Sequence, residues 1–321
     1  MTLNIQKSDF EQFAGIFMAL PLHVMFNTTY WCDSECPHCH YNCSKSNDLH
    51  KILPEQDIEH FLSEFKNTKV NIDSIAFSGG EITAIEDFQP EYIARNSYRS
   101  LLCGFWTTVM TNGSWINKPN AEHILNMFSK IYEVSGYNFE IQMSFDSYHK
   151  NCVQNANKII PALDSLITKR PVSEYKYPFS LTGFKHEPDF KNKLQVHNCK
   201  NLDVYCTSNY DLNPVGRAKT NNLPNCRDTK KEFEKFCGED KLKKLIYTPI
   251  IPAKTQNGFK SIMILTIDCL GNAELADAHN PENYNRFKTP YKKQNGEYKP
   301  FQQIKAELAM QLVDYVYGQE K

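Results

Sequence analysis

The stretch that decides the fold is Trp31-Cys32-Asp33-Ser34-Glu35-Cys36-Pro37-His38-Cys39-His40-Tyr41-Asn42-Cys43. It places the thiols of Cys32, Cys36 and Cys39 within eight residues, on a loop that Pro37 keeps free of regular structure. Three thiolates this close indicate a small shared ligand. Structural zinc takes four ligands, whereas a [4Fe-4S] cluster held by three cysteines leaves one iron open. The spacing favours the cluster over a zinc knuckle or a thioredoxin-like dithiol.

An apolar segment at residues 22–28 precedes this loop and is expected to be the first strand. Cys-x3-Cys-x2-Cys directly after a first strand resembles the signature of the radical S-adenosylmethionine (SAM) enzymes. The resemblance implies that Cys32, Cys36 and Cys39 bind a [4Fe-4S] cluster while Cys43 does not, and that the open iron binds the amino and carboxylate groups of SAM. An electron from the cluster would then cleave SAM to a 5'-deoxyadenosyl radical.

The length of 321 residues fits one α/β barrel with an added terminal segment. We expect a helical leader at 1–21, a partial (β/α)6 TIM-type barrel at 22–218, and a small α+β extension at 219–321 with a β-hairpin and a terminal helix. The net charge of -1 gives no field that would attract nucleic acid or an anionic membrane, and no apolar run is long enough to span one. Eleven cysteines without a secretory leader indicate a reducing cytoplasm.

Strands and helices are expected to alternate after the cysteine loop. Helical spacing and strand-like apolar runs predict strands at 73–77, 105–110, 139–145, 179–184 and 201–206, and helices at 54–65, 87–102, 119–132 and 152–168. Beyond residue 218, the pattern predicts a partly helical stretch at 223–247, a hairpin of 261–267 with 273–275, a long loop at 281–300 and a helix at 301–317.

A Gly-Gly-Glu sequence ends the second expected strand, at Gly79, Gly80 and Glu81. Glycines at a strand end allow the backbone to approach a ligand closely. By itself the pattern is typical of a tight turn. One βα unit after the cysteine loop, however, it resembles the SAM site of the family, which implies that these residues bind the amino group of SAM's methionine.

The third and fourth strands also end in polar residues. Asn112 lies in a Thr-Asn-Gly turn, which is either a plain loop or a SAM-facing segment like that of family members. Ser144 and Asp146 lie two apart in an extended stretch, so that both side chains point the same way and suit the ribose of an adenosyl ligand. The family's Ser-x-Asp has this place. Tyr148 and His149 could reach a substrate or form a satisfied surface pair.

A further motif, Pro214-Val215-Gly216-Arg217-Ala218, follows the sixth expected strand. Gly216 allows a backbone approach to adenine and Arg217 could hold a carboxylate, although a solvent-exposed loop arginine is the simpler alternative. Pro-x-Gly-Arg-Ala resembles radical SAM enzymes that modify peptides. Together with the segments around His38 and Asp146, it looks most like the peptide epimerases that make epipeptides, and His38 is grouped with the cofactor-binding residues on this basis.

The resemblance implies an enzyme that cleaves SAM reductively and modifies a ribosomally made peptide, with α-carbon epimerisation as the first candidate reaction. Peptide cross-linking and the modification of a small metabolite are the enzymatic alternatives. A metal-binding interaction module is the non-enzymatic one. The partners implied are the peptide or small-molecule substrate and an electron donor such as flavodoxin or ferredoxin.

Inversion at an α-carbon requires a hydrogen atom delivered from the face opposite the adenosyl group, and a neutral thiol is a natural donor. Cys237, beside Gly238, is the first candidate and Cys226 the second, against the alternative of buried, inert thiols. These two and Cys269 could instead hold a partial auxiliary cluster, but the denser cysteine group of such relatives is missing.

Overall fold

The computed structural model describes residues 7–39, 41–45, 51–68, 70–87, 89, 91–169, 175–184, 190–195, 199–210, 221, 229–255, 258–276 and 287–318. The chain divides into two compact units. We call them the barrel unit, of residues 26–62 and 74–227, and the terminal unit, of residues 1–25, 63–73 and 228–321. The first residues of β1 and β2 and the end of α2 fall in the ranges of the terminal unit.

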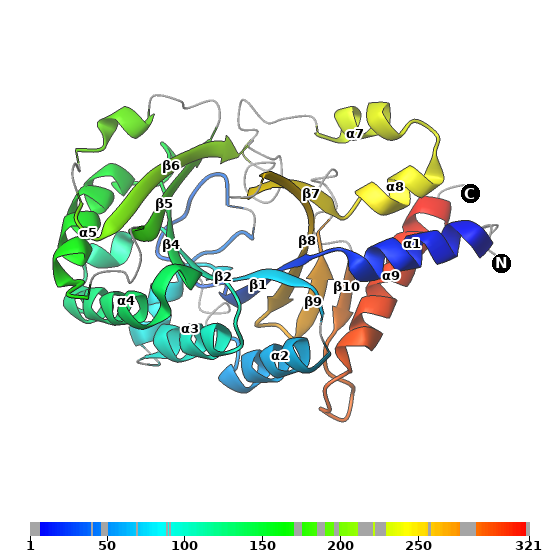
Figure 1. The fold of residues 1–321 in the computed structure, drawn as a ribbon, viewed down its shortest axis with the longest axis horizontal. Helices are drawn as coiled ribbons and strands as arrows, with labels where there is room; N and C mark the ends of the chain where they lie inside the picture. The colour runs from blue at the N-terminus through cyan, green and yellow to red at the C-terminus, as the bar shows by residue number, and fades with distance from the viewer. Residues whose placement is uncertain are drawn as a thin grey trace. The chain divides into compact units, whose positions relative to one another are not determined.

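The described part of the barrel unit is built on six strands in the order of the chain, and β2 to β6 run parallel to their neighbours. The strands are β1 (Leu22–Thr29), β2 (Ile72–Gly79), β3 (Thr107–Thr111), β4 (Phe139–Ser144), β5 (Tyr177–Phe184) and β6 (Leu202–Tyr210). The helices between them are α2 (Glu55–Thr68), α3 (Tyr92–Leu102), α4 (Ala121–Ser135) and α5 (Cys152–Leu166). Figure 1 shows α3, α4 and α5 on one face of the sheet. The partial (β/α)6 barrel expected from the sequence is confirmed.

Alternating burial in β4 separates an apolar face of the sheet from a polar one. Phe139 lies under α4, with its ring centroid 5.0 Å from that of Tyr132. Because side chains alternate along a strand, Gln142 points to the face away from the helices. There its amide Nε2 donates to Thr182 Oγ1 at 2.8 Å. The face opposite the helices therefore carries hydrogen-bonding groups, whereas the helix side forms the core.

The same polar face includes a contact between β4 and β6. The hydroxyl of Tyr205 donates to Glu140 Oε1 at 2.5 Å. Burial, followed by the Glu140 carboxylate, raises the pKa of Tyr205, so the phenol stays protonated and acts as the donor.

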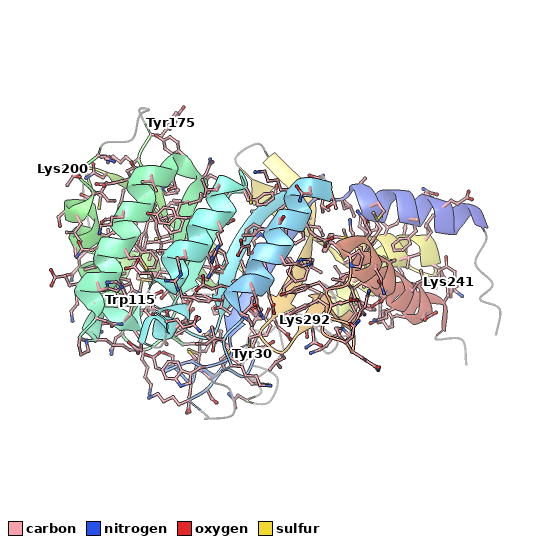
Figure 2. All side chains as sticks on the ribbon, turned by 90° about the horizontal axis from the view of Figure 1, so that it is seen from below. Tyr30, Trp115, Tyr175, Lys200, Lys241 and Lys292 are labelled. Carbon is pink, nitrogen blue, oxygen red and sulfur yellow. The ribbon has the colours of Figure 1, made fainter. Side chains whose placement is uncertain are left out.

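Figure 2 labels residues at both ends of the parallel strands. Tyr175 and Lys200, which precede β5 and β6, lie at one end of the barrel unit, and Tyr30 and Trp115, which follow β1 and β3, lie at the other (Figure 2). The carboxyl ends of the strands therefore meet at the end that carries Tyr30, as a parallel barrel requires.

The helix expected at 87–102 starts later, at Tyr92. A 3-10 helix, η2 (Ile82–Asp87), occupies the preceding residues. The buried carboxylate of Glu86 accepts hydrogen bonds from the backbone N–H groups of Glu91, at 2.6 Å, and Ile93, at 2.8 Å. This carboxylate satisfies amides at the start of α3 and so fixes where the helix begins.

In the described residues, the terminal unit consists of an antiparallel sheet and four helices. Its strands are β7 (Ile250–Thr255), β8 (Gly258–Asp268), β9 (Asn272–Leu275) and β10 (Phe287–Pro290), and its helices are α1 (Lys7–Ala19), α7 (Thr229–Cys237), α8 (Lys241–Tyr247) and α9 (Phe301–Gly318). The hairpin expected at 261–267 and 273–275 is confirmed as β8 and β9. The carboxylate of Asp268 closes its turn by accepting from the backbone N–H of Leu270 at 3.0 Å and of Asn272 at 2.8 Å.

The expectation of a long loop over 281–300 is wrong, because β10 lies within it and pairs antiparallel with β9. The segment Phe287–Pro290 is only four residues long, too short for a recognisable alternation of apolar and polar residues. Phe287 and Thr289 are buried, whereas Lys288 is exposed and forms an ion pair of 2.7 Å with Glu274 on β9. The segment is therefore a strand because it pairs with β9.

The expected leader helix is α1, and residues 1–21 belong to the same compact unit as residues 228–321. Phe13 and Phe17 are buried on its inner side. Two side chains bind the carbonyls at its carboxyl end, Asn71 Nδ2 to Ala19 O at 3.1 Å and Lys305 Nζ to Met18 O at 3.4 Å. Among the described residues, no helix has the length and apolar character needed to cross a membrane.

Lys305 should destabilise the fold at neutral pH. Its side chain is 3% exposed, and burial lowers its pKa to about 8. The pKa of Lys305 is lower in the folded state than in the unfolded state. Burial of the charged ammonium therefore lowers the free energy of unfolding by its full amount below pH 8, and this loss disappears above the pKa of the unfolded state. We expect Lys305→Met to raise the free energy of unfolding at pH 7 by on the order of 3 kcal/mol.

The gain should fade as pH rises from 8 towards the pKa of a free lysine, which denaturant unfolding at pH 7 and near pH 10 would show. Lys293→Met, at an exposed site in the same unit, is the control and should change stability by no more than about 0.5 kcal/mol. A less stable Lys305→Met protein at pH 7 would mean that the ammonium's contacts with Met18 and Phe17 outweigh its burial.

Candidate active site

The cysteine loop, residues 31–44, follows β1 at the carboxyl end of the parallel strands. Its two ends are joined by backbone hydrogen bonds, from Cys32 N to Ser44 O at 3.0 Å and from Ser44 N to Tyr30 O at 3.3 Å. Cys32 and Cys36 are each 8% exposed, and Cys39 is half-buried. The loop is thus closed on itself, with its thiols turned away from bulk water.

Two of the three expected ligand sulfurs accept a backbone hydrogen bond. The backbone N–H of Ser34 donates to Cys32 Sγ, and that of Cys43 donates to Cys39 Sγ, both at 3.4 Å. Donors directed at sulfur favour thiolates, the form that binds metal.

The Cys32 thiol would not ionise here without a positive partner. Burial, and next the nearby Glu81, raise its pKa well above the usual range. A bound metal centre reverses this balance and holds the sulfur as thiolate.

The donor set of the loop fits a cluster. Cys32, Cys36 and Cys39 bring three thiols onto one loop whose ends are joined by backbone hydrogen bonds. Structural zinc takes four ligands, whereas a [4Fe-4S] cluster held by three cysteines keeps one iron open, so the residues present fit the group expected from the sequence.

Asp33 ties the cysteine loop to the segment after β3. One carboxylate oxygen, Oδ2, forms an ion pair with Lys118 at 3.0 Å and accepts from Ser114 Oγ at 2.8 Å. The other, Oδ1, accepts from Asn112 Nδ2 at 3.2 Å. Burial alone would raise the pKa of Asp33, but the hydrogen bonds from Ser114 and Lys118 outweigh it and lower the pKa. Sequence reasoning missed this network, because nothing marks Lys118 as the partner of Asp33.

Asn112, expected near SAM, lies at the cysteine loop. Besides Asp33, its amide Nδ2 donates to Ser34 Oγ at 2.9 Å and lies 3.9 Å from Cys32 Sγ. Its side chain therefore supports the loop that carries the first cysteine, and its role towards SAM stays a prediction.

Gly79 and Gly80 make close approaches to the chain's own backbone. Gly79 has φ +121°, a conformation that side chains rarely adopt. A β-carbon at Gly80 would lie 1.8 Å from the carbonyl oxygen of Trp31 and 3.3 Å from Cys32 Cβ. The sequence indicated a close approach at this position, and the structure shows one to the cysteine loop itself. Whether these glycines also contact SAM stays a prediction.

Glu81 is fully buried and links β2 to β3. Its Oε1 accepts from the hydroxyls of Thr83, at 2.6 Å, and Thr111, at 2.7 Å, and its Oε2 accepts from the backbone N–H of Asn112 at 2.7 Å. Burial raises the pKa of Glu81 despite these bonds. The carboxylate thus holds two strand ends together, which sequence reasoning did not foresee because Thr111 is distant in sequence.

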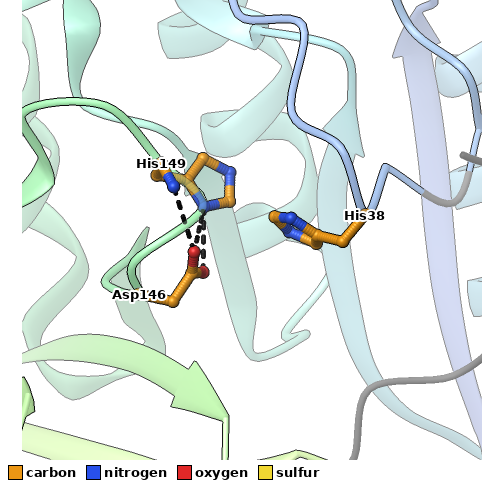
Figure 3. A group of neighbouring side chains, drawn as sticks. All are labelled: His38, Asp146 and His149. Atoms are coloured by element: carbon orange, nitrogen blue, oxygen red, sulfur yellow. Dashed lines mark hydrogen bonds and ion pairs between the residues drawn. The ribbon is translucent and has the colours of Figure 1, made fainter. Parts of the chain in front are cut away.

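Asp146 and His149 lie together with His38 of the cysteine loop (Figure 3). Asp146 is 3% exposed and accepts from the backbone N–H groups of Tyr148, at 2.9 Å, and His149, at 3.1 Å. Both its oxygens also lie within 3.0 Å of His149 Nδ1. Burial would raise the pKa of Asp146, but the hydrogen bond from His149 outweighs it and the pKa is lowered.

His149 is the partner that sequence reasoning left undecided. Burial lowers its pKa, but the hydrogen bonds to Asp146 and Cys36 outweigh burial, and the pKa rises to about 10. The three side chains have the spacing of a metal site, with ligand atoms within 4.8 Å of one another. However, Nδ1 of His149 already faces the carboxylate, which is the arrangement of a hydrogen-bonded pair and leaves no room for an ion between them.

The remaining residues expected at the site are Ser144, Gly216, Arg217, Cys226 and Cys237. Ser144 is half-buried at the end of β4, in register with Thr182. Gly216, Arg217 and Cys226 lie outside the described residues. Cys237 is buried at the end of α7 in the terminal unit, where burial raises the pKa of its thiol. It and Cys269 belong to no group of three metal-ligand side chains within the described part of the chain.

Part of the chain matches a known protein family, and solved structures share features of its fold. Residues 26–177 match the family model described as the radical SAM superfamily. SuiB from Streptococcus suis bound to precursor peptide SuiA shares 14% identity, with a TM-score of 0.51 over 98% of this chain and 70% of SuiB. The structure of SuiB bound to S-adenosylmethionine shares 14% identity, with a TM-score of 0.44 over 83% of this chain and 63% of SuiB.

Native anSMEcpe with bound AdoMet and Kp18Cys peptide gives 15% identity and a TM-score of 0.43, over 88% of this chain and 82% of its own. No curated protein matches the chain significantly in sequence. At these identities, the likeness to SuiB with its precursor peptide shows a common fold.

A side chain at Gly80 should disturb the cysteine loop. Because the clash of Gly80→Ala would be with backbone atoms of Trp31, the loop must shift, at a cost of about 1–3 kcal/mol or more. We expect lower thermal stability and a lower iron content after anaerobic reconstitution. Gly15→Ala, where no atom lies within 4 Å of the added carbon, is the control and should bind iron as the wild type does. Equal iron content in both variants would show that Gly80 does not support the loop.

Proposed function

We propose that this chain, whose residues 26–177 match the model of the radical SAM superfamily, is a radical SAM enzyme that modifies a ribosomally made peptide. The observation that carries the proposal is the closed cysteine loop, which holds three thiols after β1, two of them accepting backbone hydrogen bonds. Its cofactors are a [4Fe-4S] cluster and SAM. When bound, they supply the electron and the sulfonium whose cleavage gives a 5'-deoxyadenosyl radical.

The chain's residues then have distinct tasks. Cys32, Cys36 and Cys39 hold the cluster in the closed loop. Gly80 and Glu81 fix the loop against β2 and β3, and together with Gly79 they are proposed to meet the methionine of SAM. His38, Asn112, Ser144, Asp146, Gly216 and Arg217 remain proposed contacts of SAM.

Three features support a peptide as the substrate. The segments around His38, Asp146 and Gly216 resemble those of peptide-modifying members. The fold is shared with SuiB, which binds its precursor peptide SuiA. The face of the sheet opposite the helices also offers donors and acceptors, such as Gln142 and Tyr205, that suit the amide groups of a peptide. An external electron donor such as flavodoxin or ferredoxin would complete the system.

The substrate class can be tested with a peptide encoded beside this chain's gene. Anaerobic incubation with that peptide, SAM and dithionite should give a modified peptide by mass spectrometry or by chiral amino-acid analysis. SAM cleavage that leaves every neighbouring peptide unchanged would instead support a small metabolite as substrate.

Replacing Cys32, Cys36 and Cys39 together by Ala should abolish formation of 5'-deoxyadenosine, because no thiolate would remain to hold the cluster. The measurement is chromatography of anaerobic reactions with SAM and dithionite. Cys43→Ala is the matched control, since the contact of Cys43 with Cys39 comes from its backbone N–H, which alanine keeps. SAM cleavage by the triple variant would refute the assignment of the ligands.

For the finer reaction we propose α-carbon epimerisation, with Cys237, or in second place Cys226, as the hydrogen-atom donor. Burial keeps Cys237 as a neutral thiol, the form that donates hydrogen. Cys237→Ala and Cys226→Ala would be compared with the wild type in deuterated water. The variant that lacks the donor should still form 5'-deoxyadenosine but give little deuterium-labelled epimer. Normal epimerisation by both variants would exclude both thiols.

A further inference from the structure

The side chain of Asn27 on β1 is buried without hydrogen-bond partners. Its exposed fraction is 0%. Within the described part of the chain, neither its Nδ2 nor its Oδ1 has a hydrogen-bond partner. Folding has thus taken this amide out of water without replacing its bonds, which lowers the free energy of unfolding. Such a group calls for an explanation, and a ligand that supplies the missing bonds is one.

Asn27 points to the face of the sheet opposite the helices. The preceding residue, Phe26, stacks on Phe77, with ring centroids 5.5 Å apart. Phe77 is in register with Val109, and Val109 with Ile141, which is buried on the helix side of β4. Because side chains alternate along a strand, Asn27 points the other way, to the polar face of the barrel unit.

This face is polar and partly open. Gln142 is half-buried and donates to Thr182 Oγ1 at 2.8 Å. Tyr205 is 37% exposed and donates to Glu140 Oε1 at 2.5 Å. These side chains already bond to one another, whereas the donor and the acceptor of Asn27 are both unused. Asn27 therefore has the capacity to bind a further polar group on this face.

The chemistry of a carboxamide indicates which group would fit. A carboxamide offers a donor beside an acceptor. The terminal unit shows such a group on an extended residue: Gln311 Nε2 donates to Lys288 O, and Gln311 Oε1 accepts from Lys288 N, both at 2.9 Å. In an antiparallel pair, the N–H and C=O of one residue likewise bond together to one partner. One residue of an extended peptide therefore matches both unused atoms of Asn27.

We propose that Asn27 binds the backbone of the peptide substrate in an extended conformation, through the N–H and C=O of one residue. The inference rests on the proposed function, because it requires a peptide as the substrate. The two bonds flank the α-carbon of the bound residue and so set which way this carbon faces. Since Asn27 is closed off from solvent, the peptide reaches it only when the side chains over it move aside, which is binding by induced fit.

The first measurement is thermal unfolding of the anaerobically reconstituted full chain without peptide. Asn27→Leu keeps the size of the side chain and removes the unpartnered amide, so its melting temperature should rise by about 2–4 °C. Asn155→Leu is the matched control, because Asn155 is 2% exposed but its Oδ1 accepts from Asn117 Nδ2 at 2.8 Å. Its melting temperature should fall by about 2–4 °C.

The second measurement is calorimetric binding of the peptide encoded beside this chain's gene, without dithionite so that no turnover occurs. Asn27→Leu should bind this peptide about tenfold more weakly than the wild type, whereas Asn155→Leu should bind it normally. A set of peptides, each N-methylated at one residue, identifies the bound residue. Methylation there should weaken binding to the wild type about tenfold but change little for Asn27→Leu, because the bond is already absent.

Three results would overturn the inference. A lower melting temperature for Asn27→Leu would show that the amide supports the fold. A loss of SAM affinity in this variant, measured without peptide, would assign Asn27 to the cofactor. Equal effects of every N-methylation on the wild type and the variant would show that Asn27 does not bind the peptide backbone.

Should Asn27→Leu not fold, Asn27→Val is judged by peptide binding in the same way. Failure of both variants to fold would also overturn the inference, because the chain would then need the amide for its structure. Failure of the proposed function looks different: the wild type itself would bind none of these peptides, whatever the melting temperatures of the variants, and the inference would fall with it.

Discussion

The carboxyl end of the barrel unit depends on the close contact between Gly80 and the backbone of Trp31. The N–H of Gly80 donates to Thr29 O at 2.7 Å, and that of Glu81 donates to Trp31 O at 3.0 Å, so the pairing of β1 with β2 continues into the cysteine loop. No side chain larger than hydrogen fits there. The buried carboxylate of Glu81 also accepts hydrogen bonds from residues at the end of β3. The ends of β1, β2 and β3 are therefore linked to one another beneath the cysteine loop.

Charge at this support is balanced locally. Glu81, Asp33 and Asp146 place three carboxylates close to three expected thiolates, an arrangement that would be costly if uncompensated. Lys118 forms an ion pair with Asp33, and His149 pairs with Asp146. The carboxylate of Glu81 accepts hydrogen bonds from a hydroxyl and a backbone amide. Each acid has its own partner, so what the thiolates still require is the positive charge of the metal centre they bind.

The sequence predicted the barrel well, because cysteines, Gly79 and Gly80, and Ser144 with Asp146 recur where parallel strands end, and such ends converge. It could not predict the partners. Nothing local shows that Lys118 pairs with Asp33, that Thr111 donates to Glu81, or that Glu86 fixes the start of α3. The strand β10 was missed for the same reason, since its four residues are extended only because β9 lies beside them. The local sequence pattern predicts helices and strands. The side-chain partners that are distant in sequence become visible only in the folded structure.

The closure of the cysteine loop between Tyr30 and Ser44 bears on how the loop is anchored. The hydrogen bonds that join its ends, and the ion pair of Asp33 with Lys118, are made by protein atoms alone. The anchoring of the loop at β1 and at the segment after β3 is therefore separate from the bonds of its thiols to a metal centre. Loss of one thiol would remove a metal ligand but leave these anchors in place.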